Sequence, residues 1–186
     1  MKTLVGAWIG DDKINNQVEI DNIISIAKKG YGDMIAIGNE VLLREDLEVE
    51  ELIDYIQQVK QAVPNIPVGY VDAYYMYVNY PKIVDACDVI SVNCYPFWEH
   101  CPLDISVEFM KKMYELAVKH SKGKQVIISE TGWATKSNHA QTKANIANEE
   151  NQKIFNSVID KWTEKNQITC FFFEAFDEPW KGSTEV

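Results

Sequence analysis

The sequence lacks the signatures of several large enzyme classes. It has no GxGxxG segment after an apolar strand and no Walker loop, so nucleotide-dependent chemistry is not expected. The three histidines, His100, His120 and His139, do not have the spacing of metal ligands. We therefore expect neither a metal site nor a cofactor.

Basic residues are also scarce. The chain has 18 Lys and Arg against 28 Asp and Glu, which gives a formal net charge of −10. Surfaces that bind nucleic acid or anionic lipid need clustered positive charge, so neither partner is expected. An uncharged ligand fits this balance better. Sugars are one such class, because their rings stack on aromatic side chains, which make up 11% of the sequence.

Cysteine is sparse, and its pattern excludes two kinds of site. The four cysteines, Cys87, Cys94, Cys101 and Cys170, match neither a zinc site nor a CxxC redox pair, and we interpret them as free thiols. The N-terminal segment carries one basic residue before a predicted strand, so no signal peptide or membrane span is expected there. The sequence by itself assigns no cellular location.

What the sequence has is a regular alternation of apolar strands and amphipathic helices. The 186 residues suit one domain with an ample core. Predicted strands cover residues 3–10, 33–38, 67–71, 88–93, 125–129 and 169–173. Predicted helices cover residues 14–29, 48–63, a short stretch after the third strand, 106–120 and 149–165. Six strands alternating with five helices indicate an α/β fold with a parallel sheet.

The first predicted helix shows how the helices are expected to pack. Apolar residues recur at helical spacing, and Gly30 follows as a stop signal; these residues are Ile14, Val18, Ile23, Ile24 and Ala27. We expect these apolar side chains to form the buried face of that helix.

Two of the predicted strands end on a glutamate. Ile37-Gly38-Asn39-Glu40 closes the second strand, and Ser129-Glu130-Thr131-Gly132-Trp133 closes the fifth. Alone, a glutamate after a strand is more often a first-turn residue of a helix, where the helix dipole favours negative charge. At the carboxyl ends of strands in one parallel sheet, however, two glutamates can face each other where α/β enzymes hold their catalytic groups.

The blocks around both glutamates resemble glycoside hydrolase family 17, the β-1,3-glucanases. Residues 38–41 are similar to that family's Gly-Asn-Glu-Val, residues 129–133 to its Ser/Gly-Glu-Thr-Gly-Trp, and residues 173–181 to its last strand and following loop. The resemblance implies a TIM (β/α)8-type barrel and one glycoside hydrolase catalytic domain over residues 1–186. Only about six of the eight barrel strands are present, matching family strands three to eight. We therefore expect a domain that is incomplete at its N-terminus.

The resemblance also implies roles for individual residues. Glu40 is the expected acid/base and Glu130 the expected nucleophile of a retaining mechanism with a covalent glycosyl-enzyme intermediate, which requires carboxyl groups about 5 Å apart. Tyr95 and Lys181 are candidate hydrogen-bond donors to Glu130. For Asn39 two interpretations stay open, a turn residue at the strand end or a partner of the sugar 2-hydroxyl.

Further residues are expected to bind substrate. We interpret Trp133 as the floor under a glucose ring, with core packing as the alternative. Lining of the cleft and packing in the core are equally open for Tyr74, Phe97 and Trp98. Glu178 matches a family residue near the cleft, as does Lys181, although alone the two would be assigned to a surface ion pair.

The leading function is a retaining hydrolase of β-1,3-glucosidic bonds, acting on β-glucan oligosaccharides or polysaccharides. Alternatives are a β-1,3-glucanosyltransferase with the same site, a mannanase or endoglucanase of the same clan, and a truncated, weakly active or non-catalytic glucan-binding remnant. The family resemblance implies an extracellular or cell-wall location. Since six strands that do not close leave residues 3–10 and 169–173 as unpaired edges, we also expect self-association through those edges or marginal stability.

Overall fold

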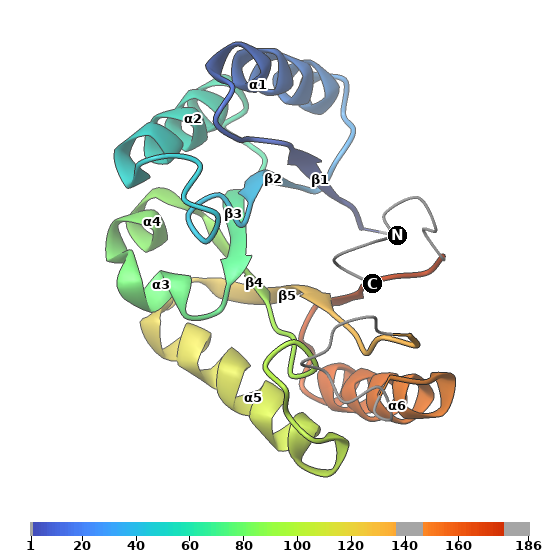
Figure 1. Ribbon diagram of the computed structural model, residues 1–186. Helices are drawn as coiled ribbons and strands as arrows, with labels where there is room; N and C mark the ends of the chain where they lie inside the picture. The colour runs from blue at the N-terminus through green and yellow to red at the C-terminus, as the bar shows by residue number, and fades with distance from the viewer. Residues whose placement is uncertain (1, 137–146, 177–186) are drawn as a thin grey trace. The chain divides into compact units, whose positions relative to one another are not determined.

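The protein is described here by a computed structural model covering residues 2–136 and 147–176, in which six strands form one sheet (Figure 1). The strands are β1 (Leu4–Ala7), β2 (Met34–Asn39), β3 (Val68–Ala73), β4 (Val89–Asn93), β5 (Gln125–Thr131) and β6 (Cys170–Phe172). The helices are α1 (Lys13–Lys28), α2 (Val49–Ala62), α3 (Met76–Asn79), α4 (Pro81–Ala86), α5 (Leu103–His120) and α6 (Glu149–Lys165).

The strand order identifies the fold class. The strands lie in the sheet in the order in which they occur in the chain, from β1 to β6. The β1/β2, β2/β3 and β5/β6 pairs are parallel. A doubly wound sheet reverses its order at a switch point, whereas a (β/α)8 barrel adds each strand beside the previous one. The predicted fold is confirmed, with six strands of a TIM-type barrel and β1 and β6 at the edges of the described sheet.

The chain divides into two compact units. Unit 1 comprises residues 1–92 and 116–127, and unit 2 comprises residues 93–115 and 128–186. Each unit is described by itself below. The prediction of a single domain over residues 1–186 stays a prediction.

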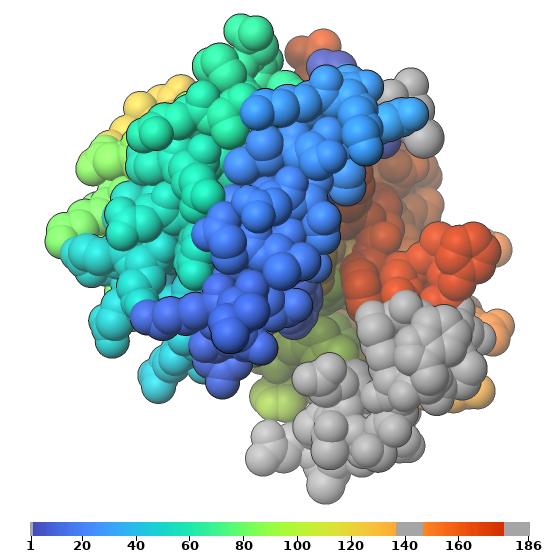
Figure 2. Space-filling model, turned by 90° about the horizontal axis from the view of Figure 1, so that it is seen from above, coloured from blue at the N-terminus to red at the C-terminus, as the bar shows by residue number. Residues whose placement is uncertain are grey.

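Unit 1 is built from the first strands and the helices that follow them. Helix α1 lies against β1, and α2 lies against β2 and β3 (Figure 1). The two helices contact each other, and the blue and teal parts of the surface adjoin in Figure 2. The core of unit 1 is aliphatic, with Ile20, Ile35, Leu52, Ile56 and Val68 almost inaccessible to solvent. Helix α2 begins at a capping box in which Glu48 and Glu51 each accept a hydrogen bond from the other's backbone N–H.

The expected face of α1 is wrong for its first two turns. Ile14 and Val18 are 82% and 51% exposed, and the buried face begins with Asn16 and Ile20 instead. The Asn16 side chain accepts a hydrogen bond from the Gly10 N–H (2.9 Å) and donates one to the Gly10 carbonyl (2.7 Å). Because these bonds satisfy the loop after β1, they hold the polar residue inside and rotate the two apolar side chains outward.

The single short helix expected after the third strand is two helices. Helix α3 ends at Asn79, and α4 begins at Pro81, whose fixed φ suits the first turn of a helix and which cannot donate an intrahelical hydrogen bond to α3. The described residues therefore contain six helices rather than five. Tyr77 is buried in this region, and its hydroxyl lies within hydrogen-bond distance of the Ser91 carbonyl (2.9 Å) and the Tyr70 carbonyl.

Unit 2 contains α6 and β6 together with parts of α5 and β5. Helix α6 covers the same residues, 149–165, that the sequence predicts. Its N-cap Asn148 accepts a hydrogen bond from the Asn151 N–H (2.7 Å), and its buried face carries Phe155 and Ile159.

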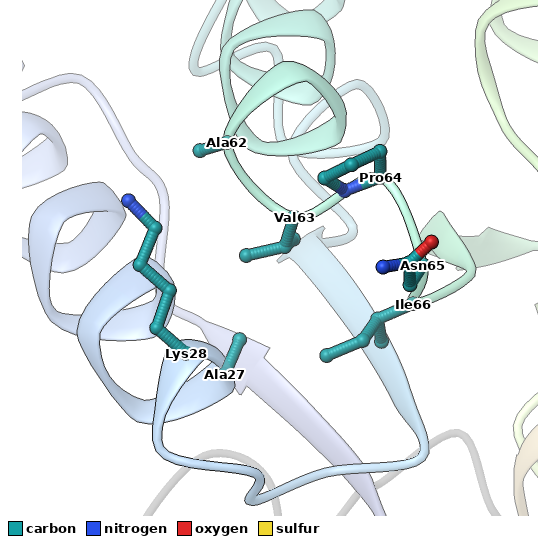
Figure 3. Close-up of a pocket in the computed structure, with 7 residues that line it drawn as sticks. All are labelled: Ala27, Lys28, Ala62, Val63, Pro64, Asn65 and Ile66. Carbon is teal, nitrogen blue, oxygen red and sulfur yellow. The ribbon is translucent and has the colours of Figure 1, made fainter.

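A small pocket lies at the amino ends of the strands in unit 1. It has a volume of about 260 Å³ and lies between the last turn of α1, at Ala27 and Lys28, and residues 62–66, which connect α2 to β3 (Figure 3). In a (β/α)8 fold the catalytic groups lie at the opposite, carboxyl ends of the strands. This pocket is therefore not part of the predicted active site.

The cysteines are free thiols, as predicted. Cys87, Cys94 and Cys101 are buried and Cys170 is half-buried. Burial raises the pKa of Cys87 and Cys170 to about 12. Within residues 2–136 and 147–176, none of the helices combines the length and the hydrophobicity needed to cross a membrane.

Candidate active site

In unit 1 the candidate site begins at the carboxyl end of β2. Gly38 has a φ of +81°, and a Cβ there would lie 2.6 Å from Val41 Cγ2, so glycine is required at this turn. Asn39 ends the strand, and Glu40 follows in the left-handed region with a φ of +55°. The Glu40 N–H donates to the Val71 carbonyl (2.9 Å), which ties the turn to β3. The turn therefore places the half-buried residues Asn39 and Glu40 at the carboxyl end of β2.

Arg44 closes the loop that starts at Glu40. Its backbone N–H donates to the Glu40 carbonyl (2.9 Å), and its guanidinium donates to the carbonyl groups of Asn39 and Ile9. The same guanidinium forms an ion pair with Asp46 (2.7 Å) and lies 5.0 Å from the centre of the Trp8 ring. One side chain thus joins the ends of β1 and β2 to the loop between β2 and α2.

A buried tyrosine and aspartate lie beneath the same loop. The Tyr70 hydroxyl accepts a hydrogen bond from the Leu42 N–H (2.9 Å) and donates one to Asp72 Oδ2. Asp72 Oδ1 also accepts from the Ala73 N–H (2.7 Å), and Asp72 is completely buried. The pKa of Asp72 is raised to about 6, mainly by burial. The hydrogen bonds from Tyr70 and Ala73 act in the opposite direction and lower this pKa, whereas the negative charge of Glu40 raises it.

In unit 2 the candidate site lies at the end of β5. The Tyr95 hydroxyl donates a hydrogen bond to Glu130 Oε2 (2.9 Å), as the sequence analysis predicts. The backbones beside Tyr95 and Glu130 are also joined, because the Cys94 N–H donates to the Glu130 carbonyl (2.9 Å). The hydrogen bond from the Tyr95 hydroxyl orients the half-buried Glu130 carboxylate.

Residues close to Glu130 make tight contacts at the end of β5. The Ser129 hydroxyl donates to Asn93 Oδ1 (2.9 Å) in a buried pair. A Cβ at position 132 would lie 2.2 Å from the Phe173 carbonyl oxygen, so only Gly132 allows the chain after β6 to pass this closely.

Trp133 is 2% exposed and lies in an aromatic cluster of unit 2. Its ring centre is 5.2 Å from that of Phe97 and 5.4 Å from that of Phe155, and Gln152 donates to its carbonyl (3.0 Å). Phe97 is also buried and packs on Trp98, which is 40% exposed. Burial favours the packing interpretation for Trp133 and Phe97, because a buried ring cannot stack on a sugar without rearrangement. Sugar contact by these three residues stays a prediction.

Of the remaining predicted substrate-binding residues, one lies within the described part of the chain and two lie outside it. Tyr74 follows β3 in unit 1, is half-buried, and packs edge-on against Tyr75 with ring centres 5.3 Å apart. Glu178 lies outside the described residues, as does Lys181, so their predicted contacts stay predictions.

Three residues of unit 1 that support the site were not among the predicted site residues. Arg44, Tyr70 and Asp72 contact the residues around Glu40 or the loop that follows it. Only Asp72 has a signal in the sequence: like the two glutamates, it is an acidic residue at the end of an apolar strand. Tyr70 resembles an ordinary strand residue, and Arg44 an ordinary loop residue.

No group of three or more His, Cys, Asp or Glu side chains among residues 2–136 and 147–176 has the arrangement of a metal site.

Known proteins are similar to this chain in sequence and in fold. The model of the BtgE/BtgC glycoside hydrolase domain matches residues 1–186. The chain belongs to this family. The crystal structure of a family 17 β-1,3-glucanosyltransferase from Rhizomucor miehei superposes with a TM-score of 0.88 at 30% identity, covering 98% of this chain and 68% of that enzyme. The chain is therefore a member of glycoside hydrolase family 17, as the sequence predicts.

Two further relatives are similar over nearly the whole chain. An active-site mutant of the R. miehei enzyme in complex with laminaritriose has a TM-score of 0.88 at 29% identity, covering all of this chain and 70% of that one. The "Probable glucan endo-1,3-beta-glucosidase btgC" of Aspergillus fumigatus is 28% identical over 206 residues, or 97% of this chain. This family 17 chain spans 30% of the length of that fungal protein.

Proposed function

We propose that this protein is a retaining glycoside hydrolase that cleaves β-1,3-glucosidic bonds of β-glucans. The observation that carries the proposal is Glu130, which accepts a hydrogen bond from Tyr95 at the end of β5, in a family 17 chain whose second strand is followed directly by Glu40. Strand-end carboxylates are the groups with which enzymes of this fold break glycosidic bonds.

In the proposed reaction, a Glu130 carboxylate oxygen attacks the anomeric carbon and forms an ester bond. The glycosidic C–O bond breaks, and the leaving oxygen takes the proton of Glu40. Water then gives a proton back to Glu40 and attacks the same carbon, which releases Glu130 and the sugar with retained configuration. We assign Asn39 to the sugar 2-hydroxyl, a contact that strengthens as positive charge develops on the ring.

The substrate class follows from the relatives and from charge. The A. fumigatus relative is named a "Probable glucan endo-1,3-beta-glucosidase", and a solved structure shows an active-site mutant of the R. miehei enzyme in complex with laminaritriose. A net charge of −10 is compatible with a neutral polysaccharide and unfavourable for an anionic one. Because β-glucans are structural polysaccharides, we also propose the cell wall or extracellular space as the place of action.

A second candidate is a β-1,3-glucanosyltransferase. It is favoured by the R. miehei structure, which is a transferase at 30% identity. The two reactions share the first step and differ in whether water or a sugar hydroxyl attacks the intermediate. Incubation with laminari-oligosaccharides separates them, since a transferase produces chains longer than the substrate.

The decisive experiment measures reducing-sugar release from laminarin beside lichenan, cellulose and mannan. We expect laminarin to be the preferred substrate, and Glu130→Ala to abolish its cleavage because no intermediate can form. Added azide should restore part of the turnover of Glu130→Ala, giving a glycosyl azide of inverted configuration. Glu40→Ala should slow laminarin cleavage more than cleavage of activated aryl glycosides.

Glu45→Gln is the matched control, because Glu45 is an exposed glutamate in the same loop as Glu40. It should retain the wild-type rate. Unimpaired cleavage by either Glu130→Ala or Glu40→Ala would refute the assignment. A folded wild-type chain that binds laminarin without cleaving it would instead support a glucan-binding protein.

A further inference from the structure

We propose that Tyr70 and Asp72 are positioning residues for Glu40, acting through the Leu42 backbone of the loop that Glu40 begins. The proposal rests on the function proposed above, in which Glu40 is the proton donor. It concerns unit 1 alone, where all of its contacts lie.

The first step of the argument is that the Glu40 conformation needs external support. Its φ of +55° lies in the left-handed region, where residues other than glycine are disfavoured by about 1 kcal/mol. Glu45 has a φ of +59°, so the loop contains a second residue in this region. A loop with two such residues keeps its shape only where surrounding contacts fix it.

The second step is that Tyr70 contacts the loop that begins at Glu40. The Leu42 N–H donates to the Tyr70 hydroxyl (2.9 Å), and both residues are buried. Since Tyr70 projects from the rigid strand β3, its hydroxyl fixes the position of the loop two residues after Glu40. Without that oxygen, the buried Leu42 N–H loses its partner.

The third step explains the aspartate. A tyrosine hydroxyl rotates freely, and its lone pairs face the Leu42 N–H only if its own proton points elsewhere. Asp72 Oδ2 accepts a hydrogen bond from the Tyr70 hydroxyl, and Asp72 Oδ1 accepts one from the Ala73 N–H (2.7 Å). Asp72 thus sets the direction in which the Tyr70 hydroxyl donates. It also interacts directly with the backbone N–H of Leu43, so the pair supports the loop after Glu40 at two adjacent residues.

The test uses two substrates that differ in their need for an acid. Cleavage of laminarin needs a proton from Glu40, whereas a 2,4-dinitrophenyl β-laminaribioside releases a leaving group that needs none. We expect Tyr70→Phe to lower kcat/KM on laminarin by about 10-fold or more while changing the aryl substrate by less than about 3-fold, since general acid catalysis contributes about 100-fold or more. Asp72→Asn should act in the same direction, because it changes the group that accepts the Tyr70 hydrogen bond.

Tyr77→Phe is the matched control, because Tyr77 is an equally buried tyrosine of unit 1 whose hydroxyl lies beside the Tyr70 and Ser91 carbonyl groups, not the loop. Any effect of this change should be equal on both substrates. An equal loss on both substrates in Tyr70→Phe, or no loss on either, would overturn the proposal.

Hydrogen exchange of residues 40–45 gives a readout that does not depend on activity. Exchange should accelerate in Tyr70→Phe and remain at the wild-type rate in Tyr77→Phe. Unchanged exchange in Tyr70→Phe would overturn the positioning role even if the enzyme were active. A wild-type chain inactive on both substrates would refute the proposed function. The exchange measurement would still show whether Tyr70 supports the loop of residues 40–45.

Discussion

Replacing Asp72 with asparagine should remove part of the pH dependence of stability. Burial raises the pKa of Asp72 to about 6 in the folded protein, whereas an exposed aspartate titrates near 3.9. The difference corresponds to about 3 kcal/mol of folding free energy.

The sign follows from the raised pKa of Asp72 in the folded state. Its contribution to stability is fully present below pH 4, where the carboxyl is protonated in both the folded and the unfolded chain. As the pH rises from about 4 to 6, the unfolded chain ionises first, and the folded state loses about 3 kcal/mol relative to it. An asparagine at this position remains neutral and has no such loss.

The assay is urea unfolding between pH 4 and pH 8, followed by far-UV circular dichroism. The free energy of unfolding of the wild type should fall relative to that of Asp72→Asn by about 3 kcal/mol across this range. Asp54→Asn, at an exposed position of α2, should follow the wild-type curve. Parallel curves for the wild type and Asp72→Asn would refute the reasoning, because they would mean that the carboxyl ionises as readily inside the protein as outside.

A further prediction concerns the other unit. Tyr95→Phe removes the hydrogen bond to Glu130 Oε2 and should lower kcat for laminarin by about 10-fold, since a hydrogen bond to a charged group contributes about 1.5–3 kcal/mol. The melting temperature should change little. An unchanged kcat would show that this hydrogen bond does not orient the nucleophile.

The boundaries of β2 and α6 could be predicted because strong local signals mark them, whereas β1 is shorter than the predicted 3–10 and α5 begins at Leu103 rather than Ser106. The second strand is a short apolar run ended by Gly38-Asn39, and the predicted and observed boundaries differ by one residue at each end. Helix α6 combines an amphipathic pattern with an Asn148 cap, and its predicted range is the observed one. Both glutamates could likewise be located, because strand and motif place them at the carboxyl ends of β2 and β5.

The buried face of α1 could not be predicted, because a contact between Asn16 and Gly10 overrides the apolar spacing of the helix. Apolar spacing places Ile14 and Val18 inside, yet Asn16 takes the interior position by bridging the N–H and carbonyl of Gly10. A single sequence does not reveal that a loop needs an amide at that point. The same holds for the division between α3 and α4, where Pro81 starts a new helix instead of ending the chain's helical stretch.

Tyr70 and Asp72 illustrate the wider limit of sequence reasoning. Their spacing of two puts both side chains on one face of β3, which the pattern shows. That a loop from residues 40–45 folds onto this face, and that its Leu42 N–H ends at the tyrosine hydroxyl, depends on contacts 28 residues apart. Asp72 makes the protein less stable at neutral pH than at pH 4, because its buried carboxyl ionises less readily than it does in the unfolded chain. A buried acid that lowers stability and is hydrogen-bonded to the support of a strained loop is best explained by what the loop carries, and this loop begins with Glu40.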